Sequence, residues 1–186
     1  MQDEGNLVRQ AQEGDEQAFG RLYEEYFDKI YRYISIRVGD TMEAEDMTQQ
    51  VFLNALKSIS SFQWKGVPFS AWLYRIAHNQ VVDHLRKKTR QPGILLNEPL
   101  ADSRGSNPQL LVEHSMDVEQ LLLATKRLTE AQREVISLRF SSGLSIKEVA
   151  RIMGKNQGAV KALQHSAILA LRKILVAGNN EEVQRI

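Results

Sequence analysis

Several common features are missing from this sequence, and each absence narrows the fold class. None of its 186 residues is a cysteine, which excludes disulfide bonds and thiolate metal sites and suits a reducing compartment. No apolar run approaches the length of a membrane span, and the acidic start MQDEG does not resemble a signal peptide. No alternating apolar pattern predicts a strand. We therefore expect a cytoplasmic, all-α protein without membrane insertion.

The four prolines are unevenly placed, and they divide the chain. Three of them lie within residues 92–108, together with two glycines and two asparagines, and this stretch has no helical periodicity. It predicts a flexible linker over residues 91–117 between two small helical domains, residues 1–90 and 118–177, followed by a frayed or weakly helical tail at 178–186. The 42% hydrophobic content is sufficient for a buried core.

The net charge of the whole chain is small, but basic and acidic residues are each concentrated in separate segments. The formal net charge is only +1, yet residues 61–90 hold six Lys/Arg against one acidic residue, and residues 126–186 hold eleven against five. Residues 1–60 hold twelve acidic residues against six basic ones, and residues 91–125 hold five against one. Two basic zones separated by acidic ones indicate two contacts with nucleic acid and at least one surface for another partner.

The first 90 residues predict about four helices. Their apolar residues recur at helical spacing over residues 6–12, from Asp15 as a cap to Arg37, from Ala44 to Ile59, and over 70–90. Six aromatic residues within 19–33 are expected in the core rather than at a cofactor site.

A second pattern, at residues 145–174, predicts two helices around a tight turn. Ser145 is a candidate cap with Glu148 three residues later, Gly154 suits the end of the first helix, and Asn156 is a good cap for the second. Between residues 145 and 173 lie six Lys/Arg and one Glu. So short a turn leaves the outer face of the second helix free, as in a DNA-binding helix-turn-helix, and the local positive charge favours this over an ordinary helical hairpin.

An aromatic and basic segment lies between these patterns. Lys65 lies among the aromatic residues Phe62, Trp64 and Phe69, and the helix that follows carries several basic residues. Rings that stack on bases, next to cations that bind phosphates, are typical of single-stranded nucleic-acid sites. A packed aromatic corner with a solvated basic helix end is the alternative. We expect Trp64 and Lys65 to contact nucleic acid, and Trp72 to pack in the protein core.

Three segments together resemble bacterial extracytoplasmic-function (ECF) sigma factors of the sigma-70 family. They are AEDMTQQVFLNAL (44–56), FSAWLYRIAHNQVVDHLRKK (69–88) and LTEAQREVISLRFSSGLSIKEVARIMGKNQGAVKALQ (128–164). The resemblance covers both predicted domains in the expected order. It implies a sigma region 2 domain, a linker and a sigma region 4 domain. It also implies a promoter-specificity subunit rather than an enzyme, with no cofactor or metal.

The resemblance implies three sets of functional residues. Core RNA polymerase would dock its largest-subunit clamp helices on an acidic helix, at Glu45, Asp46, Gln49 and Gln50; the family usually has an acid where Gln50 stands. The loop 62–68 would capture one flipped base of the melted promoter −10 DNA. The residues implied to hold this DNA are Phe62, Trp64, Lys65, Arg75, Asn79, Arg86 and Lys87. Promoter −35 DNA would be read in the major groove by Lys155, Gln157, Lys161, Gln164, His165 and Ser166.

Physical chemistry agrees with these sets. Unstacking a base costs about a few kcal/mol, which a loop that holds the extruded base can offset. Lys161, Gln164 and His165 are best placed for bases, whereas Lys155, Gln157 and the helix N-terminus suit phosphates.

Many relatives carry arginines where this chain has Leu163, Ser166, Ile168 and Leu169. This helix is more apolar, and Ile168 and Leu169 are expected to pack on the N-terminal domain, the polymerase flap or a regulator.

Other functions remain open at this stage. An autonomous helix-turn-helix regulator would explain the C-terminal domain but would leave the acidic helix and the aromatic loop unused. A helical enzyme would combine Glu43, Glu45 or Asp46 with His78 or His84, but no Glu-x-x-His or His-x-x-His pair occurs. The paired basic zones disfavour a purely structural adaptor. Relatives are commonly held inactive by an anti-sigma factor that clamps both domains, and such a partner is compatible with this chain.

Overall fold

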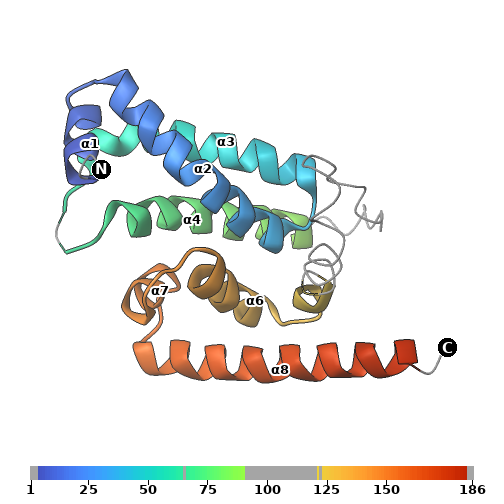
Figure 1. Ribbon diagram of the computed structural model, residues 1–186. Helices are drawn as coiled ribbons and strands as arrows, with labels where there is room; N and C mark the ends of the chain where they lie inside the picture. The colour runs from blue at the N-terminus through green and yellow to red at the C-terminus, as the bar shows by residue number, and fades with distance from the viewer. Residues whose placement is uncertain (1–3, 65, 91–120, 122, 184–186) are drawn as a thin grey trace.

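The computed structural model describes residues 4–64, 66–90, 121 and 123–183, and this part of the chain forms helices without strands. The predicted linker over 91–117 and the predicted DNA contact Lys65 lie outside the described residues. Two groups of helices are visible in Figure 1. We call them the N-terminal bundle, α1 to α4, and the C-terminal bundle, α6 to α8. This confirms the predicted all-α fold with two helical domains.

Four predicted helices form the N-terminal bundle, with α2 in contact with α1, α3 and α4. The bundle also holds one 3₁₀ turn, and its elements are α1 (Glu4–Gln12), α2 (Glu16–Val38), α3 (Thr41–Ser58), η1 (Ile59–Ser61) and α4 (Phe69–Arg90). Asp15 caps α2 as predicted, because its side chain accepts hydrogen bonds from the backbone N–H groups of Gln17 and Ala18.

The turn between α2 and α3 is tighter than predicted. Gly39 adopts a positive φ of 80° and donates its N–H to the carbonyl of Ser35, which ends α2. Asp40 follows immediately and accepts from the N–H of Glu43 at 2.8 Å, which starts α3 at Thr41. The predicted start at Ala44 was therefore wrong by one helical turn, because a C-cap and an N-cap stand side by side.

Aromatic residues of α2 form much of the core, as predicted. Tyr26 and Tyr33 are buried, and the Tyr33 ring meets the Tyr74 ring of α4 edge-on, with centroids 5.6 Å apart. Burial raises the pKa of both α2 phenols above the usual range, which keeps them neutral in the folded protein. Phe19, Phe27 and Tyr31 are half-buried against this core, and Tyr23 is 36% exposed.

The C-terminal bundle holds the predicted helix-turn-helix. Its elements are α6 (Glu130–Ile136), the π-helical continuation η2 (Ser137–Ser141), α7 (Ile146–Ile152) and α8 (Gln157–Val183). Thr129 and Gln132 form a reciprocal capping box that starts α6. The predicted tail boundary at 178 falls inside α8, which continues to Val183.

The two bundles pack against each other. The prediction of a flexible linker between them gave no indication of this contact. In Figure 1, α6 lies between α4 and α8, with α7 at the end of α4 nearest the loop that precedes it. Contacts join α4 to α7, α2 to η2 and α2 to α6. Buried apolar residues of both bundles form one contiguous core. The structure is therefore a closed arrangement of the two domains.

Candidate nucleic-acid interface

The helix-turn-helix is built from local signals that the sequence contains. Ser145 accepts from the N–H of Glu148, and the Glu148 carboxylate accepts in return from the N–H of Ser145 at 2.7 Å. Gly154 takes a positive φ of 61° in the turn, and Asn156 accepts from the N–H of Ala159 at 2.8 Å to cap α8. These caps fix the angle at which α8 leaves α7, so they position its outer face.

That outer face is exposed and basic. Val160 and Ala167 are fully buried against the bundle, and the predicted DNA contacts on the other side are solvent-exposed, namely Lys155, Gln157, Lys161 and His165. Lys161 and His165 are one turn apart, and Leu169 and Arg172 continue the same line. Arg172 is a candidate contact that the sequence argument missed, although it was counted in the basic total.

Two predicted −35 contacts form hydrogen bonds with side chains of their own bundle. Gln164 is half-buried and accepts a hydrogen bond from Arg139 Nε at 3.0 Å. Ser166 accepts from the side-chain amide of Gln132 at 2.7 Å. Because Gln164 follows the buried Val160 by four residues, it shares the inner flank of the helix. Both side chains bond α8 to α6 and η2, but Ser166 stays solvent-exposed, so only Gln164 is partly withdrawn from the outer face.

Ile168 and Leu169 differ from each other in their surroundings. Ile168 is half-buried and packs on the core. Leu169 is 46% exposed, in line with the basic outer face.

The aromatic loop has a buried base and an exposed tip. Phe62 is 5% exposed, and its ring contacts those of Phe69 and Trp72 at centroid distances of 5.8 and 5.2 Å. Trp64 is 43% exposed and packs edge-on against Phe62 at 5.2 Å. Phe62 therefore supports the loop rather than facing DNA, which corrects its predicted role. Trp72 packs as expected, and Trp64 is left as the ring that a base can reach.

The start of the loop is anchored to α1. The side-chain amide of Gln12 donates to the carbonyls of Ile59 and Phe62 at 3.0 and 2.8 Å. Gly66 has a positive φ of 67°, a conformation that glycine adopts without strain. Anchoring of this kind holds the exposed ring at a defined place.

A basic stripe runs along α4 away from the core. Leu73, Ala77 and Val81 are buried on the inner side, and the exposed side presents the predicted residues Arg75, Asn79, Arg86 and Lys87. Arg75 and Asn79 lie one turn apart, and Arg86 follows two turns later. The spacing of these three suits a strand of phosphates that runs along the helix, although the exposed Asp83 lies between Asn79 and Arg86.

The α3 residues predicted to meet polymerase lie together on a solvent-facing side. Ala44, Thr48 and Val51 are fully buried, whereas the predicted set is exposed, namely Glu45, Asp46, Gln49 and Gln50. The side-chain amide of Gln50 donates to Asn54 at 3.0 Å. Exposed apolar side chains adjoin this face, since Met42, Leu53 and Leu56 are 78%, 50% and 49% exposed. Acidic and apolar groups together suit a protein partner rather than DNA.

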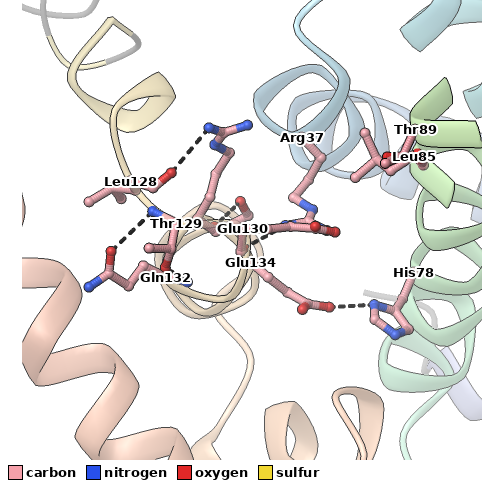
Figure 2. A network of polar contacts seen from close by, with 11 residues as sticks. Arg37, His78, Leu85, Thr89, Leu128, Thr129, Glu130, Gln132 and Glu134 are labelled. Carbon is pink, nitrogen blue, oxygen red and sulfur yellow. Dashed lines mark hydrogen bonds and ion pairs between the residues drawn. The ribbon is translucent and has the colours of Figure 1, made fainter. Parts of the chain in front are cut away.

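Of the rival acid–histidine combinations, the structure brings together Glu43 and His84. Glu43 lies 3.3 Å from both His84 and Lys88, whereas His78 pairs with Glu134 of the other bundle, as Figure 2 shows. Within the described residues, no three His, Asp or Glu side chains are grouped so that they could hold a metal ion. In that same part of the chain, no helix is both long and apolar enough to cross a membrane.

Comparisons with known proteins assign the family. The sigma-70 region 2 model matches residues 22–91, and the sigma-70 region 4 model matches residues 124–173. The ECF RNA polymerase sigma factor SigW of Bacillus subtilis is 33% identical over 182 residues, which cover 90% of this chain and 94% of SigW. The chain belongs to the ECF sigma factors.

A further relative and two solved structures are also similar to this chain. The ECF RNA polymerase sigma factor BldN of Streptomyces coelicolor is 44% identical over 170 residues, which cover 91% of this chain and 64% of BldN. Among solved structures, CnrH in complex with the cytosolic domain of CnrY has a TM-score of 0.67 at 25% identity, over 92% of this chain and 96% of that one. The sigma factor RpoE in complex with the anti-sigma factor NepR from Bartonella quintana has a TM-score of 0.72 at 25% identity, over 84% and 96% of the two chains.

Proposed function

We propose that this sigma factor binds core RNA polymerase and directs it to promoters with a −10 and a −35 element, where it assists DNA melting. The observation that carries the proposal is the separation of three chemically distinct surfaces on one chain. They are an acidic and apolar face on α3, an exposed tryptophan beside a basic stripe on α4, and a basic outer face on α8. The protein acts in the cytoplasm, as a specificity subunit without an enzymatic activity of its own.

The α3 face is the proposed polymerase contact. Glu45 and Asp46 supply negative charge, and Gln49 and Gln50 supply hydrogen-bonding groups one turn further along. Leu53 and Leu56 lie exposed beyond them and gain from burial against a partner. Charged groups of this kind speed association and set the register, while the apolar side chains contribute affinity. We assign the clamp helices of the largest subunit as the partner of this face.

Melting at the −10 element is assigned to the loop and α4. An extruded base loses stacking worth about a few kcal/mol, and stacking on an aromatic side chain returns roughly 1–3 kcal/mol. Trp64 is the exposed ring at the loop tip, and Arg75, Asn79, Arg86 and Lys87 extend from the loop along α4. These residues would hold the separated strand by its phosphates while Trp64 holds one base.

Recognition of the −35 element is assigned to α8. Its N-terminal turn, with Lys155 and Gln157, faces phosphates, and Lys161 and His165 face base edges in the major groove. Arg172 is added as a phosphate contact on the same line. Gln164 and Ser166 are left out, because α6 and η2 hold them.

An anti-sigma factor is a further proposed partner. The two solved structures described above each hold a protein of similar fold with a second protein, and in one of them the sigma factor RpoE is bound to the anti-sigma factor NepR. This chain shares their fold over most of its length. We propose that an anti-sigma factor of its own holds it inactive.

One binding experiment separates this function from an autonomous regulator. A pool of random duplex fragments is presented to the protein alone, to core RNA polymerase alone and to the two together, and retained fragments are sequenced. A sigma factor selects a −10 and −35 pair only in the combined sample. Selection of the same single motif by the protein alone and by the mixture would contradict the proposal and support the regulator.

A further inference from the structure

Helix α1 carries none of the surfaces assigned so far. Its residues, Glu4–Gln12, precede the segment 22–91 that the sigma-70 region 2 model matches. None of the polymerase or DNA contacts proposed above lies on it. It contacts α2 and the 3₁₀ turn η1, which leads into the aromatic loop. The helix therefore lies between the body of the N-terminal bundle and the loop that carries Trp64.

The bundle holds α1 in place along its whole length. The hydroxyl of Tyr26 on α2 donates to the Glu4 carboxylate at 2.9 Å, at the first turn of α1. Three apolar residues on the inner side are buried, namely Leu7, Val8 and Ala11. Because both the first turn and the inner side are fixed, the last turn of α1 is a rigid point from which a side chain can hold another segment.

Gln12, the last residue of α1, makes the contact with the loop. Its half-buried side-chain amide donates to the carbonyls of Ile59 and Phe62 at 3.0 and 2.8 Å. An amide nitrogen has two N–H donors, so these two bonds use both of them. One bond reaches the first residue of η1 and the other reaches the residue after it. We call these two hydrogen bonds the loop anchor.

The two carbonyls stand where helical hydrogen bonding ends. The last carbonyls of a helix have no partner within it. The N–H of Phe62 still donates to the Ile59 carbonyl at 3.0 Å, but Phe62 itself has an extended backbone, with φ −66° and ψ 133°. Gln12 thus bonds the Phe62 carbonyl at the point where the chain leaves the helical path. A buried carbonyl without a partner costs free energy, so the anchor fixes the direction in which the loop begins.

Trp64 lies only two residues beyond this anchor. Its ring is 43% exposed and packs edge-on against the ring of Phe62 at 5.2 Å. Its carbonyl accepts a hydrogen bond from the N–H of Gly66 in a tight turn. A ring that is ordered before it meets a base does not have to be ordered on binding, which favours the bound state.

We propose that α1 supports the loop that captures the extruded −10 base, and that Gln12 is the positioning residue. Gln12 touches no DNA in this scheme; it acts through the Phe62 backbone on the place of the Trp64 ring. The inference rests on the proposed function, because it takes Trp64 to be the residue on which the base stacks. It extends that function to a helix outside the matched region 2 segment.

Two variants of Gln12 and one control separate hydrogen bonding from packing. Gln12→Met keeps the length of the side chain and its helix propensity but has no N–H donor. Gln12→Lys restores donors, because an ammonium group has three N–H bonds. Gln17→Met is the matched control, since it makes the same change at an exposed position on α2. Circular dichroism verifies that each variant keeps its helix content.

Tryptophan fluorescence reports on the loop without polymerase or DNA. The chain has two tryptophans, so Trp72→Phe in all samples leaves the emission of Trp64 alone. We expect the fluorescence anisotropy of Trp64 to fall in Gln12→Met, because the ring moves more freely when the anchor is lost. It should stay unchanged in Gln17→Met, and Gln12→Lys should regain most of it.

Promoter melting measures the functional consequence. Core polymerase and a promoter selected in the binding experiment above are used, with 2-aminopurine in the −10 element. Loss of the two bonds should reduce the fraction of loops in the capturing position, and with it the equilibrium constant for open-complex formation, about tenfold in Gln12→Met. Affinity for core polymerase and affinity of the complex for a −35 duplex should both stay unchanged, whereas a general loss of stability would lower all three quantities.

Unchanged Trp64 anisotropy in Gln12→Met would overturn the proposal, and so would open-complex formation equal to that of Gln17→Met. A parallel fall of all three quantities would overturn it as well, because it would show a purely structural role. The anisotropy is independent of the proposed function. If Gln12→Met releases Trp64 but even the unmodified protein melts no promoter, the anchor of the loop stands and the sigma-factor function fails.

Discussion

Substitution Trp64→Ala isolates the step in which a base leaves the duplex. The ring is 43% exposed and contacts Phe62 at 5.2 Å, so its removal takes away the loop tip and leaves the buried aromatic group in place. Loss of one edge-on ring pair should lower the free energy of unfolding by about 1 kcal/mol. Loss of a stacked base should cost about 2 kcal/mol in the open complex, or about 30-fold in its equilibrium constant.

The assay follows 2-aminopurine in the −10 element, whose fluorescence rises when the base unstacks. Tyr23→Ala is the matched control, because Tyr23 is 36% exposed and contacts Phe27 and Phe52 at 5.1 and 4.7 Å, away from the loop. We expect Tyr23→Ala to melt the promoter like the unmodified protein, and Trp64→Phe to retain most of the signal. Equal open-complex formation by Trp64→Ala and Tyr23→Ala would refute the stacking role.

The remaining predictions concern affinity and stability. Lys155→Ala should weaken binding of the polymerase complex to promoter DNA by about tenfold and lower the slope of log affinity against log salt by about 1, as measured by anisotropy across a salt series; an unchanged slope would exclude a phosphate contact there. Glu45→Lys should reduce affinity for core polymerase by about tenfold in a titration in which Glu24→Lys has no effect, and equal effects would remove α3 from the interface. Ser145→Ala should lower the free energy of unfolding by about 1 kcal/mol and Tm by about 3 °C in thermal melts, because it breaks the capping box, and an unchanged Tm would contradict that geometry. Burial raises the pKa of Tyr33 above its ordinary 10.0, so the unfolded chain loses this proton first, and above about pH 10 the free energy of unfolding should fall by roughly 1.4 kcal/mol per pH unit for this group. Denaturant titrations between pH 9 and 11 should show a shallower fall in Tyr33→Phe, and identical slopes would contradict the burial argument.

Local signals were sufficient to predict most of the helix-turn-helix and the first bundle. Ser145, Gly154 and Asn156 act through hydrogen bonds within four residues, so their roles can be read from neighbours in the sequence. Asp15 caps α2 for the same reason. Helical spacing also separated the exposed Glu45 and its neighbours from the buried face of α3.

Contacts between distant segments were not predictable in this way. Gln164 and Ser166 have the spacing and polarity of base contacts, and only the positions of Arg139 and Gln132, 25 and 34 residues away, show that both side chains form hydrogen bonds within the bundle. Phe62 and Trp64 are similar in sequence but opposite in burial, because the loop folds over Phe69 and Trp72. Arg37 resembles an ordinary basic residue at a helix end. Its partner Glu130 is 93 residues away in the other bundle, so the closed arrangement has no local signal.

Run-off transcription tests the central claim most directly. Core RNA polymerase transcribes a promoter library with and without this protein, and the transcripts are sequenced from their 5′ ends. The account predicts start sites that appear only when the protein is added, with a shared −10 and −35 pair upstream of them. Identical transcripts in the two samples, from a folded protein free of any inhibitor, would contradict the account.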